Sequence, residues 1–309
     1  MISRSSTPEV FRYFPTTMRT PLILLTLTTG LASAQTSPSM IGVIHTTATL
    51  REAVTAWCDD RSSAMQKYGN IAYWDTSGVF DLSFLFSRYE AGWKEGSPYC
   101  SAFDTFNDDL SRWDTSKVTN MEGMFAGAAS FNKPVGSLDL RQVTTTNGMF
   151  AGCKSFNQDM RNWMTSSVQD MAFMFDSASS FNLPLPWDVS SVRTMRGMFN
   201  DAHSFNQSSV GSWNTENVED FRAMFANAMS FDQDSVASWD VSKATRMYKM
   251  FWGASAFVGD LSEWAVDSVQ DMKDMNEMFA KEPALHKDYS TWRGRRLKAT
   301  GRGRFVRPG

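Results

Sequence analysis

Aspartates recur at one fixed place in a repeated sequence pattern, and carboxylates are ligands that calcium prefers. They are Asp75, Asp114, Asp139, Asp188 and Asp240. Met164 and Ala265 interrupt the column, and the dense oxygen-rich loop of calcium-binding repeats is missing. The W-D-x-S setting favours instead an aspartate or serine that accepts hydrogen bonds from turn N–H groups. We therefore expect these carboxylates to shape turns, with calcium as the less favoured alternative.

The histidines do not assemble a catalytic or metal-binding motif. His45 lies in a linker, His203 in a turn between repeat units, and His286 in the last place of a polar column. None has a metal-ligand spacing or stands beside a nucleophile signature. Because an enzyme needs a convergent set of groups, the sequence predicts a non-enzymatic protein without metal or cofactor.

The three cysteines divide into one thiol and one pair. Cys153 stands where other units have alanine, so it should be a buried free thiol. Cys58 and Cys100 remain, and in a secreted chain two remaining cysteines favour a disulfide. Our hypothesis is that this bond ties an insertion at 87–100 to an N-terminal cap.

A repeated unit of about 25 residues positions these side chains. Each unit holds a tryptophan, a Met-Phe pair and a second phenylalanine. In the unit that begins at Trp113, apolar residues from Val118 to Ala128 fit one face of a short helix, and 106–113 should be extended. One helix face and one strand cannot bury a core alone, so we expect an α/β repeat solenoid of about eight stacked units over 74–292.

The residue after the second phenylalanine is polar in successive units. The column consists of Asn107, Asn132, Asn157, Asn182, Asn206 and Asp232. Its place looks buried, and unpaired burial would be costly, so we predict a ladder that bonds to the backbone of adjacent units. Exposed turn asparagines are the alternative. Asn206 also begins a glycosylation sequon, Asn-Gln-Ser, which a ladder position disfavours.

The N-terminal end has three expected parts. Residues 1–34 have the basic, apolar and small-residue order of a secretory signal peptide, and their apolar run is too short to span a bilayer. The 17 residues before Met18 are more than such a segment needs, so Met18 is the alternative start to Met1. A linker at 35–48 and a helical cap at 49–73 follow, because apolar residues there keep helical spacing. We expect a secreted or cell-surface protein without a transmembrane segment in the mature chain.

Two segments do not repeat and are candidates for recognition. The insertion carries Tyr89, Trp93 and Tyr99, which would form either an interaction loop or a lid over the first unit. The segment 293–309 is basic although the net charge of the chain is −3, and its arginines include Arg293, Arg295, Arg296, Arg302 and Arg304. We expect a disordered solvated tail; binding to an acidic surface polymer and binding to nucleic acid are alternatives, and the acidic body argues against nucleic acid.

The pattern FNxDLSxWDTSxVTxMxxMFxGAxxF closely resembles the repeats of BspA-like leucine-rich-repeat surface proteins, including Mycoplasma-type lipoprotein repeats and microalgal relatives. The resemblance covers about Leu50 to Trp292. It implies a right-handed LRR-like (leucine-rich-repeat-like) stack and adhesion or protein binding at a cell surface, and the family's pattern has no catalytic residue to transfer.

We therefore expect a secreted, non-enzymatic scaffold that binds extracellular or cell-surface proteins or an acidic polysaccharide. A structural component of an extracellular coat or wall is the alternative. A glycan-binding protein that uses exposed aromatic rings is a third hypothesis, weakened because the tryptophan column looks like core.

Overall fold

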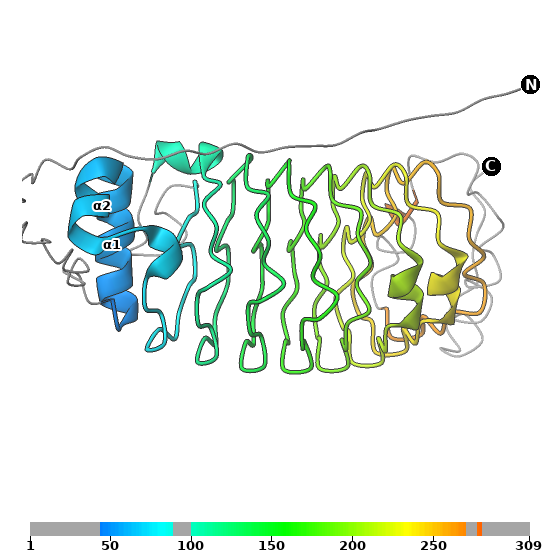
Figure 1. Ribbon diagram of the computed structural model, residues 1–309. Helices are drawn as coiled ribbons and strands as arrows, with labels where there is room; N and C mark the ends of the chain where they lie inside the picture. Colours follow the sequence, from blue (N-terminus) through cyan, green and yellow to red (C-terminus); the bar gives the residue numbers. More distant parts are fainter. Residues whose placement is uncertain (1–43, 89–99, 270–276, 280–309) are drawn as a thin grey trace, which may run out of the picture. The chain divides into compact units, whose positions relative to one another are not determined.

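The computed structural model describes residues 44–88, 100–269 and 277–279, all within one compact unit that spans Met40–Gly309. From Trp74 onward, the described chain forms successive turns that lie side by side (Figure 1). The expected signal peptide, most of the insertion, and the basic tail lie outside the described residues. Among the helices that are described, none is long and apolar enough to cross a membrane.

Two helices form the N-terminal cap: α1 spans Thr47–Asp59 and α2 spans Arg61–Tyr68. A capping box between Thr46 and Thr49 begins α1, so the helix starts inside the stretch expected to be linker. Asp60 begins α2 by accepting hydrogen bonds from the next turn. The 3-10 helix η1, Ile71–Tyr73, then leads into the first repeat.

The cap covers the apolar end of the first repeat. The Trp57 ring of α1 lies 6.1 Å from the Phe103 ring and 5.5 Å from the Phe106 ring. The Arg51 guanidinium donates to the backbone carbonyl of Ser83 at 2.8 Å. The disulfide between Cys58 and Cys100 adds a covalent link, with the Cα atoms 5.8 Å apart. Without such a cover, the end of a repeat stack would expose its core to water.

Single parallel β-bridges join each repeat to the next. They pair Asp81 with Asn120, Asn120 with Thr145, Thr145 with Asp170, Asp170 with Thr194, Thr194 with Asp220, and Asp220 with Arg246. The bridged residues therefore form one column across the repeats. In the described residues no longer strand is present.

The short helix expected over Val118–Ala128 is not formed; the segment is a series of turns. The N–H groups of Met121, Gly123, Phe125 and Gly127 donate to carbonyls of the next repeat. The N–H groups between them, from Met124 onward, donate to the third residue back within the same repeat. Half of the donors that a helix would use are thus committed to the neighbouring repeat, which explains why the apolar spacing produces turns.

This alternation needs left-handed backbone at two places per repeat. In the repeat that begins at Trp113 these places are Gly123, with φ 56°, and Gly127, with φ 80°. Glycine adopts this region without a steric penalty. Other repeats place Phe173 and Ser177 there, also at positive φ, so stacking overrides the local preference.

The stretch expected to be extended, 106–113, contains no bridge. Equivalent stretches of later repeats form the 3-10 helices η3, Ser208–Ser212, and η4, Asp234–Ser238, and η2 spans Ser101–Thr105 before the second repeat. A tryptophan follows each of η3 and η4, and its backbone N–H donates to a carbonyl of the 3-10 helix, Trp213 to Val210 and Trp239 to Val236. The bridges lie instead inside the segment expected to be helical.

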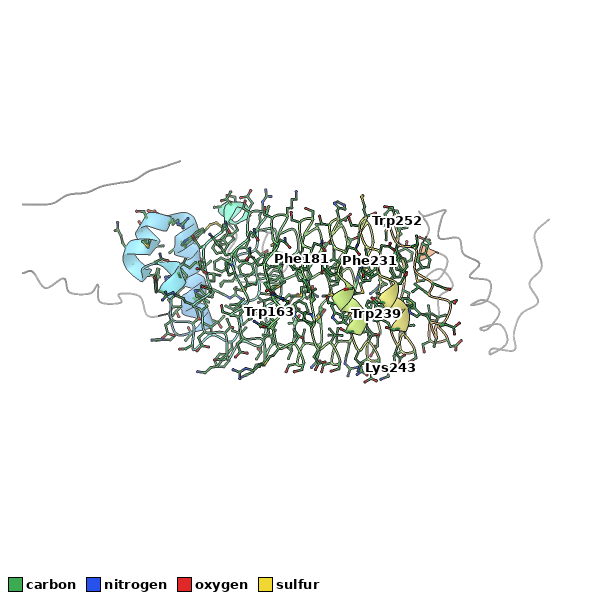
Figure 2. All side chains as sticks on the ribbon, turned by 45° about the vertical axis from the view of Figure 1, so that its right-hand side comes forward. Trp163, Phe181, Phe231, Trp239, Lys243 and Trp252 are labelled. Atoms are coloured by element: carbon green, nitrogen blue, oxygen red, sulfur yellow. A yellow bond between two sulfur atoms is a disulfide. The ribbon has the colours of Figure 1, made fainter. Side chains whose placement is uncertain are left out.

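Columns of stacked rings fill the core. Phe175 lies 5.7 Å from Phe150 and 5.6 Å from Phe199 in the neighbouring repeats, and 4.2 Å from Phe181 in its own. In the described tryptophan column of the repeats, each indole N–H donates to a backbone carbonyl; that of Trp163 donates to Val135 at 3.0 Å. Figure 2 shows Trp163, Phe181, Phe231 and Trp239 along the stack. These buried tryptophans are not available to stack on a glycan.

The polar column forms a hydrogen-bonded ladder. The side-chain oxygen of each member accepts from the backbone N–H of the next, as Asn132 does from Asn157 at 2.9 Å. The ladder runs from Asn107 to Asp232, which accepts from Val258 at 3.3 Å. Its members are half-buried or exposed. The position is therefore less buried than the sequence suggested, because the side chains lie along the outside of the stack.

Candidate functional site

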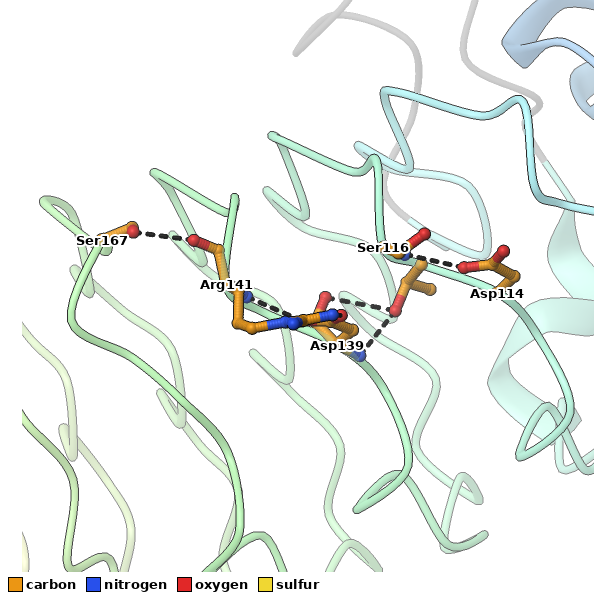
Figure 3. A network of polar contacts seen from close by, with 6 residues as sticks. Asp114, Ser116, Asp139, Arg141 and Ser167 are labelled. Carbon is orange, nitrogen blue, oxygen red and sulfur yellow. Dashed lines mark hydrogen bonds and ion pairs between the residues drawn. The ribbon is translucent and has the colours of Figure 1, made fainter.

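The recurring aspartates shape turns. Asp114 accepts a hydrogen bond from the backbone N–H of Ser116 at 2.9 Å, and Asp139 accepts from Arg141 in the same way (Figure 3). Hydrogen bonds from the side chain and backbone of Ser116 lower the pKa of Asp114. The column therefore uses its oxygens within its own turns. No group of three His, Cys, Asp or Glu side chains in the described part of the chain is placed to hold a metal ion.

The described histidines are paired individually with aspartates. His45 Nδ1 lies 3.0 Å from Asp75, and His203 Nε2 lies 3.8 Å from Asp201. The third, His286, lies outside the described residues. The structure brings no nucleophile signature to either described pair.

The cysteines occupy the places that the sequence assigned to them. Cys58 and Cys100 form the disulfide of the cap. Cys153 is a free thiol with no exposed surface; its Sγ donates to the Phe125 carbonyl at 3.1 Å, and burial raises the pKa of the thiol. A buried thiol with a raised pKa is a poor nucleophile.

The sequon asparagine is part of the ladder. The side-chain oxygen of Asn206 accepts from the backbone N–H of Asp232 at 3.0 Å and from the Gln233 side chain. The other sequence candidates for recognition, the aromatic residues of the insertion and the arginines of the tail, lie outside the described residues.

The structure adds one candidate that the sequence analysis missed, here called the bridge face. In each repeat it consists of five residues: the bridged residue, the residue before it, and the residues two, three and six positions after it. The first residue of the face is Phe80, which precedes the bridged Asp81, and the last is Trp252, six positions after the bridged Arg246. The backbone hydrogen bonds of this segment repeat, but its outward side chains change from repeat to repeat. The sequence signal for it was the variation on either side of the recurring Met-Phe pairs.

The first half of the bridge face is acidic. Over the repeats from Phe80 to Asp176 its charged side chains are Asp81, Glu122, Asp170 and Asp176. Arg51 of the cap approaches Asp81 at 3.8 Å, and the Asn147 amide donates to Asp170 at 3.1 Å. Burial raises the pKa of Asp176, whose carboxylate also accepts a 2.8 Å hydrogen bond from Asn200.

The second half is basic and partly aromatic. Its cations are Arg193, Arg196, Arg222, Arg246 and Lys249. Two acids oppose them: Asp220 lies 2.6 Å from Arg222 and 3.5 Å from Arg246, and Glu219 pairs with Arg193 at 3.2 Å. At the rim of the face, Arg88 and Asp201 each add one charge opposite to that of their half.

Two cations of the second half, Arg196 and Lys249, contact aromatic rings. The Arg196 guanidinium lies 5.2 Å from the centre of the Phe173 ring. Lys249 Nζ lies 4.7 Å from the centre of the Trp252 ring and 5.2 Å from that of Tyr248. Such contacts fix a cation in place without neutralising its charge.

Comparison with known proteins identifies a family and no activity. The family model "Mycoplasma protein of unknown function, DUF285" matches residues 97–186 and 185–292, which together are more than half of the 309 residues. Neither among curated proteins nor among solved structures was a match found. The matched segments begin just before Cys100 and include every bridged residue of the face except Asp81. The chain thus belongs to the DUF285 family, whose description assigns no function.

Proposed function

We propose that the protein is a secreted, non-enzymatic repeat scaffold that binds a partner at a cell surface through its bridge face. The observation that carries the proposal is the contrast between a repeating backbone and non-repeating side chains on this face. Core and ladder positions keep their residue types because packing and hydrogen bonding require them. On the bridge face, side chains of the bridged column such as Asn120 and Asp170 still accept a hydrogen bond from the N–H two residues on. In the described repeats the other exposed positions of the face have no such recurring bond, so a ligand can decide which residues stand there.

We propose further that the stack is of the BspA-like, right-handed LRR type. The column of parallel bridges, the rings stacked between successive repeats and the asparagine ladder support this proposal. Repeat stacks of this kind commonly present extended binding surfaces. The alternative function is a structural component of an extracellular coat or wall. The stacked repeats support it as well, because a rigid stack of repeats can serve as a building unit.

The test blocks the bridge face in the full chain. Gln169 is exposed on this face, whereas Asn162 is exposed on the segment that carries the ladder. We would compare Gln169→Cys and Asn162→Cys, each coupled to a polyethylene glycol maleimide. The native cysteines do not compete, because two form a disulfide and Cys153 is buried.

Each labelled protein is then used to capture ligands from a cell-surface extract. We expect capture by the Asn162-labelled protein to equal that by the unlabelled protein, and capture by the Gln169-labelled protein to be lost. Equal capture by both labelled proteins would refute the bridge face as the binding surface.

A further inference from the structure

We propose that the basic half of the bridge face binds an acidic polysaccharide, a linear glycan that carries sulfate or carboxylate groups. The inference rests on the proposed function, because it names the ligand class of the same face. The site comprises Arg196, Arg222, Arg246, Tyr248, Lys249 and Trp252.

The placement of the cations follows the repeat. Arg196 and Arg222 occupy the same position of successive repeats, and the next repeat adds Arg246 and Lys249 at neighbouring positions. Parallel bridging places equivalent residues of adjacent repeats at about the 4.8 Å separation of paired strands. Two cations in register and two more on the next repeat form a row of closely spaced positive charges, which suits a polymer that carries many anionic groups along its chain.

The row retains an excess of positive charge. Asp220 contacts two arginines, Arg222 and Arg246, so one carboxylate is shared between two cations. Arg196 and Lys249 are held over aromatic rings. In the next repeat, Glu277 takes the place equivalent to Lys249.

The side chains between the cations favour a glycan over an acidic protein. Other positions of this half hold small residues that are buried or half-buried, such as Gly197, Ala223 and Ala226, and none of these presents a large apolar side chain. Protein partners usually rely on large apolar side chains in well-packed pockets, whereas exposed cations suit a charged glycan. Tyr248 and Trp252 add half-exposed aromatic surface at one end, against which a sugar ring can stack.

The experiment measures binding of the full chain to heparin, to carboxylated alginate, to neutral dextran and to polyglutamate at fixed ionic strength. The face variant combines Arg196→Ser, Arg246→Ser and Lys249→Ser; Arg222 remains to pair with Asp220. The matched control combines Lys117→Ser, Lys154→Ser and Arg161→Ser, which remove three exposed cations elsewhere. A third protein replaces the six arginines of 293–309 by serine.

We expect heparin or alginate to bind the natural chain, the control and the tail variant, and the face variant to lose about tenfold in affinity. Unfolding curves of the face variant should match those of the natural chain, which separates lost binding from lost folding. Binding should weaken as salt is added, since Arg196 and Arg246 are exposed.

Three outcomes would overturn the proposal: unchanged affinity of the face variant, loss of binding only in the tail variant, or equally tight binding of polyglutamate or dextran. Because purified polymers are used, a negative result here leaves capture from the cell-surface extract as a separate test of the proposed function. If labelling at Gln169 left capture unchanged, the bridge face would no longer be a candidate binding surface, and the proposed function would fail as well.

Discussion

The core columns and the bridge face lie on the same turns of chain and differ in what repeats. Phe175 occupies a core place that is phenylalanine in each described repeat, and it has no exposed surface. Three residues earlier in that repeat the face has Ala172, and the next repeat has Arg196 there. Packing between repeats fixes the first position. The second is held by hydrogen bonds of its backbone groups, including one from its N–H to the side chain two residues before it, and these do not depend on its own side chain. Stability and recognition are therefore assigned to different residues of one segment.

The largest test of this division is a core truncation. Phe175→Ala removes a ring that stacks on both neighbouring repeats and on Phe181. We expect it to lower the free energy of unfolding by about 3–5 kcal/mol, measured by chemical denaturation. A loss below about 1 kcal/mol would show that the ring columns do not carry the stability of the stack.

The disulfide tests whether a feature that does not repeat can also carry stability. The double variant Cys58→Ser, Cys100→Ser opens a loop with a sequence separation of 42 residues. We expect a loss of about 2–4 kcal/mol, because the unfolded chain regains freedom. Reductant should lower the stability of the natural chain by a similar amount and leave that of the double variant unchanged. Insensitivity of the natural chain to reductant would contradict this assignment.

The ladder is a repeating feature on the outside of the stack, so its expected effect is smaller. Asn157→Ala deprives the Asn182 N–H of its acceptor, and we expect a loss of about 1 kcal/mol. Asn157→Asp keeps an acceptor oxygen, as Asp232 does, and should remain closer to the natural chain at pH 7. Equal losses in the two variants, measured by thermal unfolding, would mean that the hydrogen bond is not the source of stability.

The smallest expected effects on stability come from two aspartates whose pKa values are shifted in opposite directions. Hydrogen bonds from Ser190 lower the pKa of Asp188 in its turn, whereas burial raises the pKa of Asp176 on the bridge face. The stability from Asp188 is present above the unfolded pKa and is lost as pH falls through the lower folded pKa. For Asp176 the ionised form costs stability above the raised folded pKa, and this cost disappears below the unfolded pKa.

At pH 7, Asp188→Asn should therefore lower the free energy of unfolding and Asp176→Asn should raise it, each by less than about 1 kcal/mol. The gain from Asp176→Asn should vanish below about pH 4, where the carboxyl group is protonated in both states. Denaturation curves at several pH values measure both effects. If both variants changed the free energy of unfolding in the same direction at pH 7, the turn and the bridge face would not affect their aspartates in opposite ways.

Much of the candidate chemistry was decided by residue type and position along the chain. The W-D-x-S context pointed to turn formation, and Asp114 does accept from Ser116. The substitution of alanine by Cys153 pointed to a buried thiol, which the structure contains. The bridge face escaped notice because most of its positions share no residue type from repeat to repeat. Only pairing with adjacent repeats places Arg222 and Arg246 at the same carboxylate.

By itself, the sequence determined the period of the repeat, the apolar columns and the cysteines left to pair, because each depends on which residue types recur. Only the tertiary structure decided how the backbone hydrogen bonds are shared. Apolar spacing from Val118 to Ala128 is the same for a helix and for turns that donate alternately to the next repeat. The choice between them depends on a neighbouring repeat as hydrogen-bonding partner, and that partner lies about 25 residues away in the chain.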